Sequence, residues 1–111
     1  MQAVYFIGIG GIGMSAIARY FLNIGIFVGG YDKTPSALTE ALEQEGAIIH
    51  YEDDVQLIPV ECLEKENCLV VYTPAIPASH KEWNFFKEKG FNIQKRAQVL
   101  GTLTQSIKGL S

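Results

Sequence analysis

Val4-Tyr5-Phe6-Ile7-Gly8-Ile9-Gly10-Gly11-Ile12-Gly13-Met14-Ser15 is the stretch of this chain that decides its fold. Residues 4–7 form a short apolar run, which is typical of a buried parallel strand. A glycine turn follows and leads into a predicted helix, whose apolar residues recur at helical spacing: Ile12, Ala16, Ile17, Tyr20, Phe21 and Ile24. The stretch therefore predicts a strand, a tight turn and a helix in direct succession.

The glycines of this turn match a nucleotide-binding pattern. Gly8, Gly10 and Gly13 fit G-x-G-x-x-G, and Asp32 follows about twenty residues later. Glycines let the backbone turn tightly and let N–H groups approach a phosphate at the positive end of a helix dipole. A tight turn without a ligand would use the same residues. The pattern favours binding of a nucleotide diphosphate, and it does not identify the nucleotide.

Composition limits the classes of protein to consider. The 111 residues form one expected domain, residues 1–111, with an ordinary 48% of apolar residues. No apolar run approaches the length of a membrane span, and the first residues do not resemble a signal peptide, so we expect a cytoplasmic chain with no membrane partner. The net charge of −3 and the lack of a basic stripe argue against nucleic acid as a partner. Oligomeric state stays open.

Cysteines and histidines are too few to predict a metal site. Cys68 opens an apolar run and is expected to be buried, whereas Cys62 is expected to be a reduced surface or half-buried thiol. We expect no disulfide between them. His50 and His80 are expected to be surface residues rather than metal ligands. The aromatic residues of the nearby helix are expected to pack in or near the core: Trp83, Phe85 and Phe86.

The remaining pattern alternates strands with helices. Further strands are expected at residues 26–32, 47–50, 68–72 and 91–94, with a turn of helix near 55–58 and a last helix from residue 97. Thr34 is the predicted cap of the second helix, and Ser79 with Glu82 predicts a capping box for the third. These elements predict an α/β fold, a Rossmann-like open parallel five-stranded sheet in the order 3-2-1-4-5, with helices on both faces.

That strand order places a crevice beside the first strand. The sheet order switches between the first and fourth strands, and ligands of such sheets bind outside the carboxyl ends of the strands. Three segments meet there: the glycine turn, Asp32, and the loop at 73–77. We expect an extended nucleotide to lie in this crevice.

Three further pieces make the chain similar to a known family. They are Gly30-Tyr31-Asp32, Thr73-Pro74-Ala75-Ile76-Pro77 and Lys95-Arg96-Ala97-Gln98-Val99-Leu100. With the glycine stretch, they resemble the amino-terminal domain of the Mur ligases of peptidoglycan synthesis, over nearly the whole chain and in the family's order. Two departures are Tyr31, where the family often has serine, and Thr73-Pro74-Ala75, where it often has Ser-Ser-Ala.

The resemblance implies a function for the complete enzyme. Such a ligase joins L-alanine to the lactyl carboxylate of UDP-N-acetylmuramate, and it uses ATP and Mg²⁺ to activate that carboxylate as an acyl phosphate. The pattern G-x-x-x-x-G-K-[ST] occurs nowhere in these residues. We therefore expect a substrate-binding domain alone, without the ATP-binding and C-terminal ligase domains, with no cofactor of its own and no ligase or ATPase activity.

The site residues implied by this resemblance fall into three groups. Backbone N–H groups are expected to hold the diphosphate: Gly10, Gly11, Ile12, Gly13, Met14 and Ser15. Asp32 is the candidate for a ribose or uridine hydroxyl, although it could serve only as a turn residue before Thr34. The uridine or sugar is expected to contact Thr73, Pro74, Ala75 and Ile76. Arg96 is a candidate for a phosphate or the muramyl carboxylate, with an ordinary surface arginine as the alternative.

Other functions remain open at this point. A nicotinamide-dinucleotide-binding domain of an oxidoreductase would share the glycine turn and Asp32, and so would a non-catalytic nucleotide-sensing module. Within the Mur ligases, a relative that attaches recycled murein tripeptide would share the same substrate domain. A titration that compares UDP-N-acetylmuramate, UDP and NAD separates the first two classes from a Mur ligase.

Overall fold

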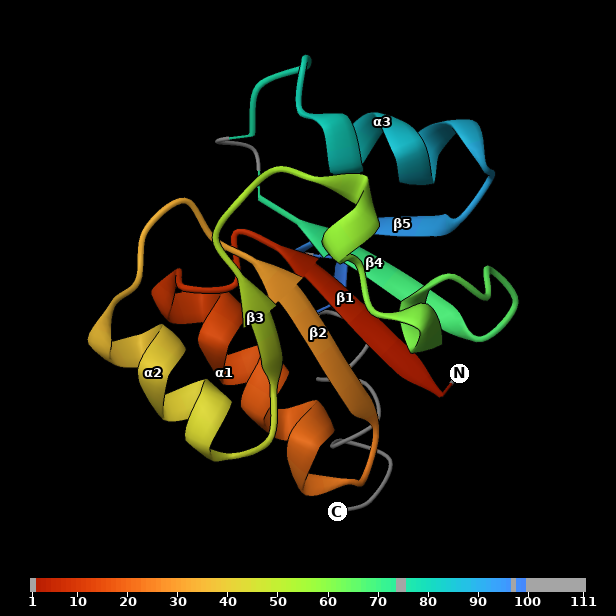
Figure 1. Ribbon diagram of the computed structural model, residues 1–111. Helices are drawn as coiled ribbons and strands as arrows, with labels where there is room; N and C mark the ends of the chain where they lie inside the picture. Colours follow the sequence, from red (N-terminus) through yellow and green to blue (C-terminus); the bar gives the residue numbers. More distant parts are fainter. Residues whose placement is uncertain (1, 74–75, 97, 100–111) are drawn as a thin grey trace.

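The computed structural model, which describes residues 2–73, 76–96 and 98–99, contains a five-stranded parallel sheet. The strand order is β3-β2-β1-β4-β5, as predicted (Figure 1). The strands are β1 (Ala3–Ile7), β2 (Phe27–Tyr31), β3 (Ile48–His50), β4 (Cys68–Tyr72) and β5 (Asn92–Lys95). Several of these strands begin or end one residue away from the predicted position. The register pairs Ile7 with Tyr31 on one side and with Tyr72 on the other, so the ends of three strands lie level.

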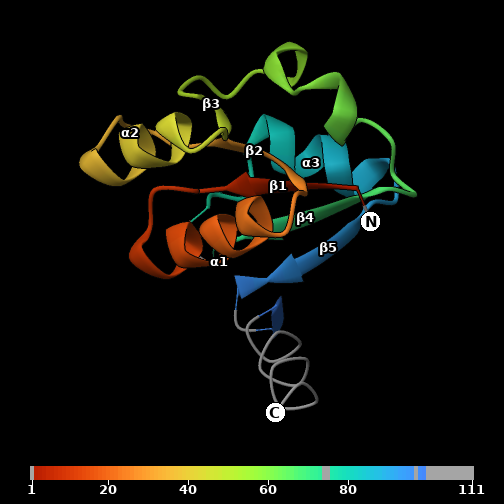
Figure 2. The ribbon, with the colours of Figure 1, turned by 90° about the horizontal axis from the view of Figure 1, so that it is seen from below.

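Helices cover both faces of the sheet (Figures 1 and 2). One face packs on α1 (Ile12–Asn23) and α2 (Ala37–Gln44). The other packs on α3 (Lys81–Glu88) and two 3-10 turns, η1 (Val55–Leu57) and η2 (Val60–Cys62). The turn of helix predicted near 55–58 is therefore present. No helix in the described part of the chain has the length and apolar character needed to cross a membrane.

Strand β1 lies at the centre of both cores. All five of its residues are buried, because it has a neighbouring strand on each side and helices on each face. Val4 and Phe6 point into the core beneath α1, whereas Tyr5 and Ile7 point into the core beneath α3. This alternation follows from the two-residue repeat of a strand, and it makes the glycine turn an extension of the most buried element.

The inner face of α1 is offset from the predicted one. Met14, Ile17, Ala18 and Phe21 are buried, at the spacing of a single helix stripe, whereas Ile12 is 84% exposed. Gly25, with φ of +81°, follows the end of this helix as predicted. The predicted apolar face was therefore wrong at Ile12, Ala16 and Ile24, which are all exposed.

Two predicted helix caps were wrong. Helix α2 is capped by Ser36, whose side chain accepts the N–H of Thr39 while the Thr39 hydroxyl accepts the N–H of Ser36. Thr34 is not available as the cap, because its backbone N–H donates to Asp32. This reciprocal capping box satisfies two N–H groups that the helix leaves without partners.

The N-terminus of α3 is capped by His80 rather than Ser79. The Nδ1 atom of His80 accepts the N–H of Trp83, and the distant Asp53 carboxylate accepts the N–H groups of Lys81 and Glu82. Glu82 does not reach back to the cap, because its side chain is fully buried. An acceptor 28 residues earlier in the sequence thus replaced the local box.

Cys62 is buried, contrary to the expectation of a surface or half-buried thiol. It lies in η2 beneath the sheet, where a Cβ on Gly29 would be 3.3 Å from its sulfur. Cys68 is buried as predicted, and both cysteines are free. A hydrogen bond with the Cys68 thiol, together with burial, raises the pKa of the Cys62 thiol. The buried Cys62 thiol therefore stays protonated and neutral.

We expect Cys62→Ser to lower the free energy of unfolding by about 1–3 kcal/mol, because a buried hydroxyl is costlier to desolvate than a thiol. Urea denaturation followed by circular dichroism measures the change. Ser79→Ala, at an exposed position, is the control and should change stability by less than about 0.5 kcal/mol. A Cys62→Ser variant as stable as the parent would contradict the packing described for η2.

Candidate functional site

The glycine turn leaves β1 and bends sharply beside β2. Gly8 has φ of +92°, and a Cβ there would lie 2.7 Å from a methyl carbon of Thr73, so only glycine fits without strain. The N–H groups of Gly8 and Ile9 donate to the carbonyl of Tyr31 at 2.8 and 3.0 Å. The turn is therefore fixed between the ends of β2 and β4.

Asp32 connects the glycine turn to the segment after β2. One carboxylate oxygen accepts the N–H of Gly10 at 2.7 Å, and the other accepts the N–H of Thr34 at 3.1 Å. A Cβ on Gly10 would come within 2.6 Å of this carboxylate. The turn role considered for Asp32 is thus present. A carboxylate has further lone pairs for a ligand hydroxyl, and Asp32 lines the neighbouring pocket.

The six N–H groups predicted to hold a diphosphate divide into two sets. Those of Gly10, Gly11 and Ser15 donate within the chain, to Asp32 and to the carbonyls of Gly8 and Gly11. Within the described residues, the N–H groups that begin α1 make no such bond: Ile12, Gly13 and Met14. They lie at the positive end of the helix dipole, and the first turn holds no acidic residue. This set can receive an anion.

Arg96 lies over the same helix start. A Cβ on Gly13 would be 2.1 Å from the Nη1 atom of Arg96, so the guanidinium occupies the space that a side chain at Gly13 would take. Arg96 comes directly after β5, at the far edge of the sheet from β3. The structure therefore brings a cation from the end of the described chain to the free N–H groups of α1.

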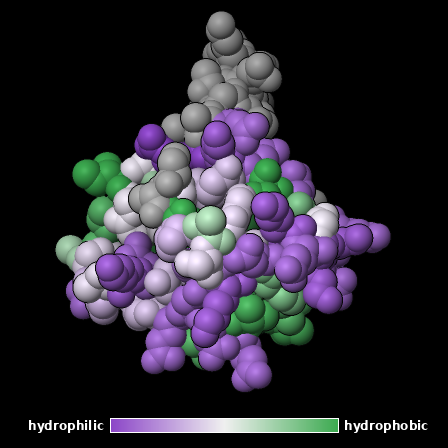
Figure 3. Space-filling model, turned by 90° about the horizontal axis from the view of Figure 1, so that it is seen from above, coloured by the Kyte–Doolittle hydropathy of each residue, from purple (hydrophilic) through white to green (hydrophobic). Residues whose placement is uncertain are grey.

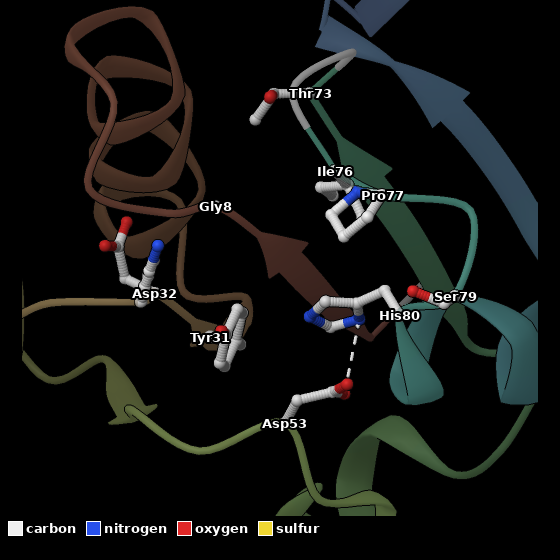
Figure 4. Close-up of a pocket in the computed structure, with 10 residues that line it drawn as sticks. Gly8, Tyr31, Asp32, Asp53, Thr73, Ile76, Pro77, Ser79 and His80 are labelled. Carbon is white, nitrogen blue, oxygen red and sulfur yellow. Dashed lines mark ion pairs between the residues drawn. The ribbon is translucent and has the colours of Figure 1, made fainter.

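A pocket of about 480 Å³ opens beside the glycine turn (Figure 4). Two predicted site residues from the loop after β4, Thr73 and Ile76, line it, whereas Pro74 and Ala75 lie outside the described residues. Seen from above, the surface of the molecule is largely hydrophilic, with paler residues near its centre and several hydrophobic patches (Figure 3). The remaining lining residues come from four segments: Gly8, Tyr31, Asp32, Lys33, Asp53, Pro77, Ser79 and His80.

His80 lines this pocket as a buried residue, so the expectation of a surface histidine was wrong. Its Nδ1 atom is 3.3 Å from the Asp53 carboxylate, and its ring centre is 4.8 Å from that of Tyr31. Burial raises the pKa of the Tyr31 hydroxyl, and the neighbouring carboxylates of Asp53, Glu82 and Asp32 raise it further. Sequence reasoning missed His80 and Asp53, because nothing local pairs residues 53 and 80.

A buried polar cluster lies behind the pocket. The Glu82 carboxylate is fully buried. It accepts hydrogen bonds from the Tyr5 hydroxyl and from the N–H of Asp54, the latter at 3.2 Å. It also lies 2.6 Å from Nε2 of His50. Burial, followed by the charge of Glu82, raises the pKa of the Tyr5 hydroxyl. His50 is thus part of a hydrogen-bonded cluster and not the surface residue expected. No group of three or more histidine, cysteine or acidic side chains within the described residues fits a metal ion.

Comparison with known proteins places this arrangement in a family. The description "Mur ligase family, catalytic domain" matches residues 3–108. The chain belongs to the Mur ligase family. Membership of the Mur ligase family accounts for the glycine turn without the alternative of a nicotinamide-dinucleotide-binding domain.

Relatives of this Mur ligase chain carry a consistent name. The UDP-N-acetylmuramate–L-alanine ligase of Phocaeicola vulgatus is 59% identical over 99% of the chain, and that of Flavobacterium johnsoniae is 58% identical over 95%. The chain covers 24% and 23% of those two proteins, about a quarter of their length.

A solved structure shares the fold. The UDP-N-acetylmuramate–alanine ligase of Thermotoga maritima matches with a TM-score of 0.81 and 26% identity, over 95% of this chain and 23% of that one. A murein peptide ligase of Psychrobacter arcticus matches with a TM-score of 0.77 at 21% identity, over 92% of this chain and 20% of that one. The second likeness concerns the fold alone.

Proposed function

We propose that this chain binds UDP-N-acetylmuramate for a ligase that attaches L-alanine to the lactyl carboxylate of that substrate. The observation that carries the proposal is the anion site at the start of α1. The N–H groups of Ile12, Gly13 and Met14 have no partner among the described residues, and the Arg96 guanidinium lies against Gly13, near a pocket lined by Gly8 and Asp32. A diphosphate matches this combination of helix dipole, N–H donors and cation.

The neighbouring residues suggest how the rest of the substrate lies. With the diphosphate on α1, Asp32 has lone pairs left for a ribose hydroxyl, and the pocket that it lines accepts the uridine. Thr73 and Ile76 form the wall opposite, and we keep Pro74 and Ala75 as proposed contacts of the uridine or sugar. Gly10, Gly11 and Ser15 then support the turn rather than donate to phosphate.

The rest of the proposed reaction lies outside these residues. In the longer enzyme, ATP and Mg²⁺ would activate the lactyl carboxylate, which is what the resemblance to the Mur ligases implies. The residues described here bind and orient the substrate, and we assign none of them a catalytic role. A cytoplasmic location, where UDP-linked precursors and ATP are available, is part of the same proposal.

We expect the 111-residue chain to bind UDP-N-acetylmuramate and UDP at least about tenfold more tightly than NAD or ATP, because its anion site and pocket are arranged for a uridine diphosphate. Isothermal titration calorimetry with the four ligands measures this ratio. Heat from NAD, with no response to either uridine nucleotide, would overturn the proposal and return the oxidoreductase alternative.

A further inference from the structure

The imidazole of His80 leaves one polar atom without a partner. Its side chain is only 6% exposed, and among buried side-chain nitrogen and oxygen atoms of the described residues, its Nε2 is the one with no hydrogen bond. A buried donor or acceptor without a partner costs free energy, so such an atom in a folded protein calls for an explanation. The pocket that His80 lines supplies one.

The hydrogen bonds of the other ring nitrogen decide what Nε2 can do. Nδ1 accepts the N–H of Trp83 at 3.3 Å, and a neutral imidazole that accepts at Nδ1 carries its proton on Nε2. In a doubly protonated ring, Nδ1 would instead donate to the Asp53 carboxylate, 3.3 Å away, and Nε2 would still carry a proton. Nε2 is therefore a hydrogen-bond donor in both states.

The surroundings of His80 limit which ligand group can reach this donor. One ring nitrogen faces Asp53, and the other points toward Tyr31 across the pocket (Figure 4). The half-buried Tyr31 ring lies against the imidazole at an interplanar angle of 66°. A rotation of the Tyr31 side chain would open a path to Nε2 for a flat group that enters between Tyr31 and the opposite wall of Ile76 and Pro77.

We propose that His80 recognises the nucleobase, with Nε2–H donating to the O4 carbonyl of uracil; this rests on the proposed binding of a uridine diphosphate. The walls formed by Tyr31, Ile76 and Pro77 suit a planar ring, whereas the residues of the anion site do not line this pocket. Cytosine has an amino group in place of the O4 carbonyl, so a donor would face the His80 donor. The geometry thus favours UDP over CDP.

Asp53 helps to fix the position of the His80 Nε2 donor. Its carboxylate accepts the N–H groups of Lys81 and Glu82 at 2.8 and 3.0 Å, so the start of α3 and Asp53 form one unit around His80. The ring is therefore held by the helix that it caps. A fixed donor rejects a mismatched ligand more strongly than a mobile one, because it cannot turn away from the clash.

The test compares UDP and CDP by calorimetry on the 111-residue chain and on two variants. His80→Asn keeps a strong helix cap, because asparagine accepts the N–H of Trp83 as Nδ1 does, but its shorter amide does not reach the position of Nε2. We expect a UDP preference of about tenfold in the parent, and within about twofold in His80→Asn. Glu88→Ala, which changes an exposed residue of the same helix outside the pocket, should keep the parent's ratio.

Long-range ¹H–¹⁵N spectra of the two histidines provide a second readout that does not depend on a variant. We expect the Nε2–H form of His80 before and after UDP is added, with a shift of its Nε2 resonance on binding, while His50 serves as the reference. Equal affinity of the parent for UDP and CDP, an unchanged preference in folded His80→Asn, or a change of tautomer with UDP would each overturn the proposal. No binding of UDP at all would instead refute the proposed function.

Discussion

Replacing Glu82 by alanine is expected to lower the free energy of unfolding by about 3–5 kcal/mol. Glu82 is fully buried, and its carboxylate accepts from Tyr5 and Asp54 and lies against His50. Alanine would leave these polar groups without their acceptor and would also open a cavity in the core beneath α3. Urea denaturation, monitored by circular dichroism, gives the change directly.

Two further variants make this measurement specific to the buried carboxylate. Glu82→Gln keeps the volume and one acceptor oxygen, so we expect it to lose about 1–2 kcal/mol. Glu88→Ala removes an exposed glutamate from the same helix and should lose less than about 0.5 kcal/mol. If Glu82→Ala cost no more than Glu88→Ala, the cluster would not contribute to stability.

The second large effect is on binding. We expect Gly13→Val to lower the affinity for UDP more than about tenfold while changing the free energy of unfolding by less than about 1 kcal/mol. The new side chain would displace the Arg96 guanidinium and crowd the free N–H groups of α1. Stability should change little, because the displaced atoms are the end of a flexible, exposed side chain.

Ala16→Val and Arg96→Ala are the matched controls. Ala16→Val adds a valine to the same helix, on an exposed face one turn further along, and should leave binding unchanged. Arg96→Ala should weaken binding by itself, and Gly13→Val in that background should add less than its separate effect, because both changes remove the same cation. A folded Gly13→Val variant that binds UDP as the parent does would place the ligand elsewhere.

The sheet was predictable because its signals are local. Short apolar runs, glycine at helix ends and the alternation of strand with helix are all read within a dozen residues. They gave the strand order, the buried β4 and the meeting of Asp32 with the glycine turn. The contact of Arg96 with Gly13 was not a geometric prediction, since nothing in the spacing of the chain joins residues 13 and 96.

The errors have one physical cause, which is long-range competition for polar groups. Asp53 supplies acceptors to α3, so Ser79 does not cap it, and Asp32 takes the N–H of Gly10, which removes that donor from the anion site. His80 is buried and His50 is half-buried, and acidic side chains from other segments lie against both. A single sequence holds the residues of such pairs but not their pairing.

The central position of β1 has a consequence for synthesis on the ribosome. Strand β1 is synthesised before β4, which is its second neighbour in the sheet. The pairing of Ala3 with Cys68 shows how far apart in the sequence the two strands lie. Until β4 has left the exit tunnel, one edge of the most apolar strand is open, and Tyr5 lacks Glu82, which is made later still. The nascent chain therefore carries an unpaired, aggregation-prone edge until β4 has been made, and the segment between β3 and β4, which is synthesised in that interval, is rich in acidic residues.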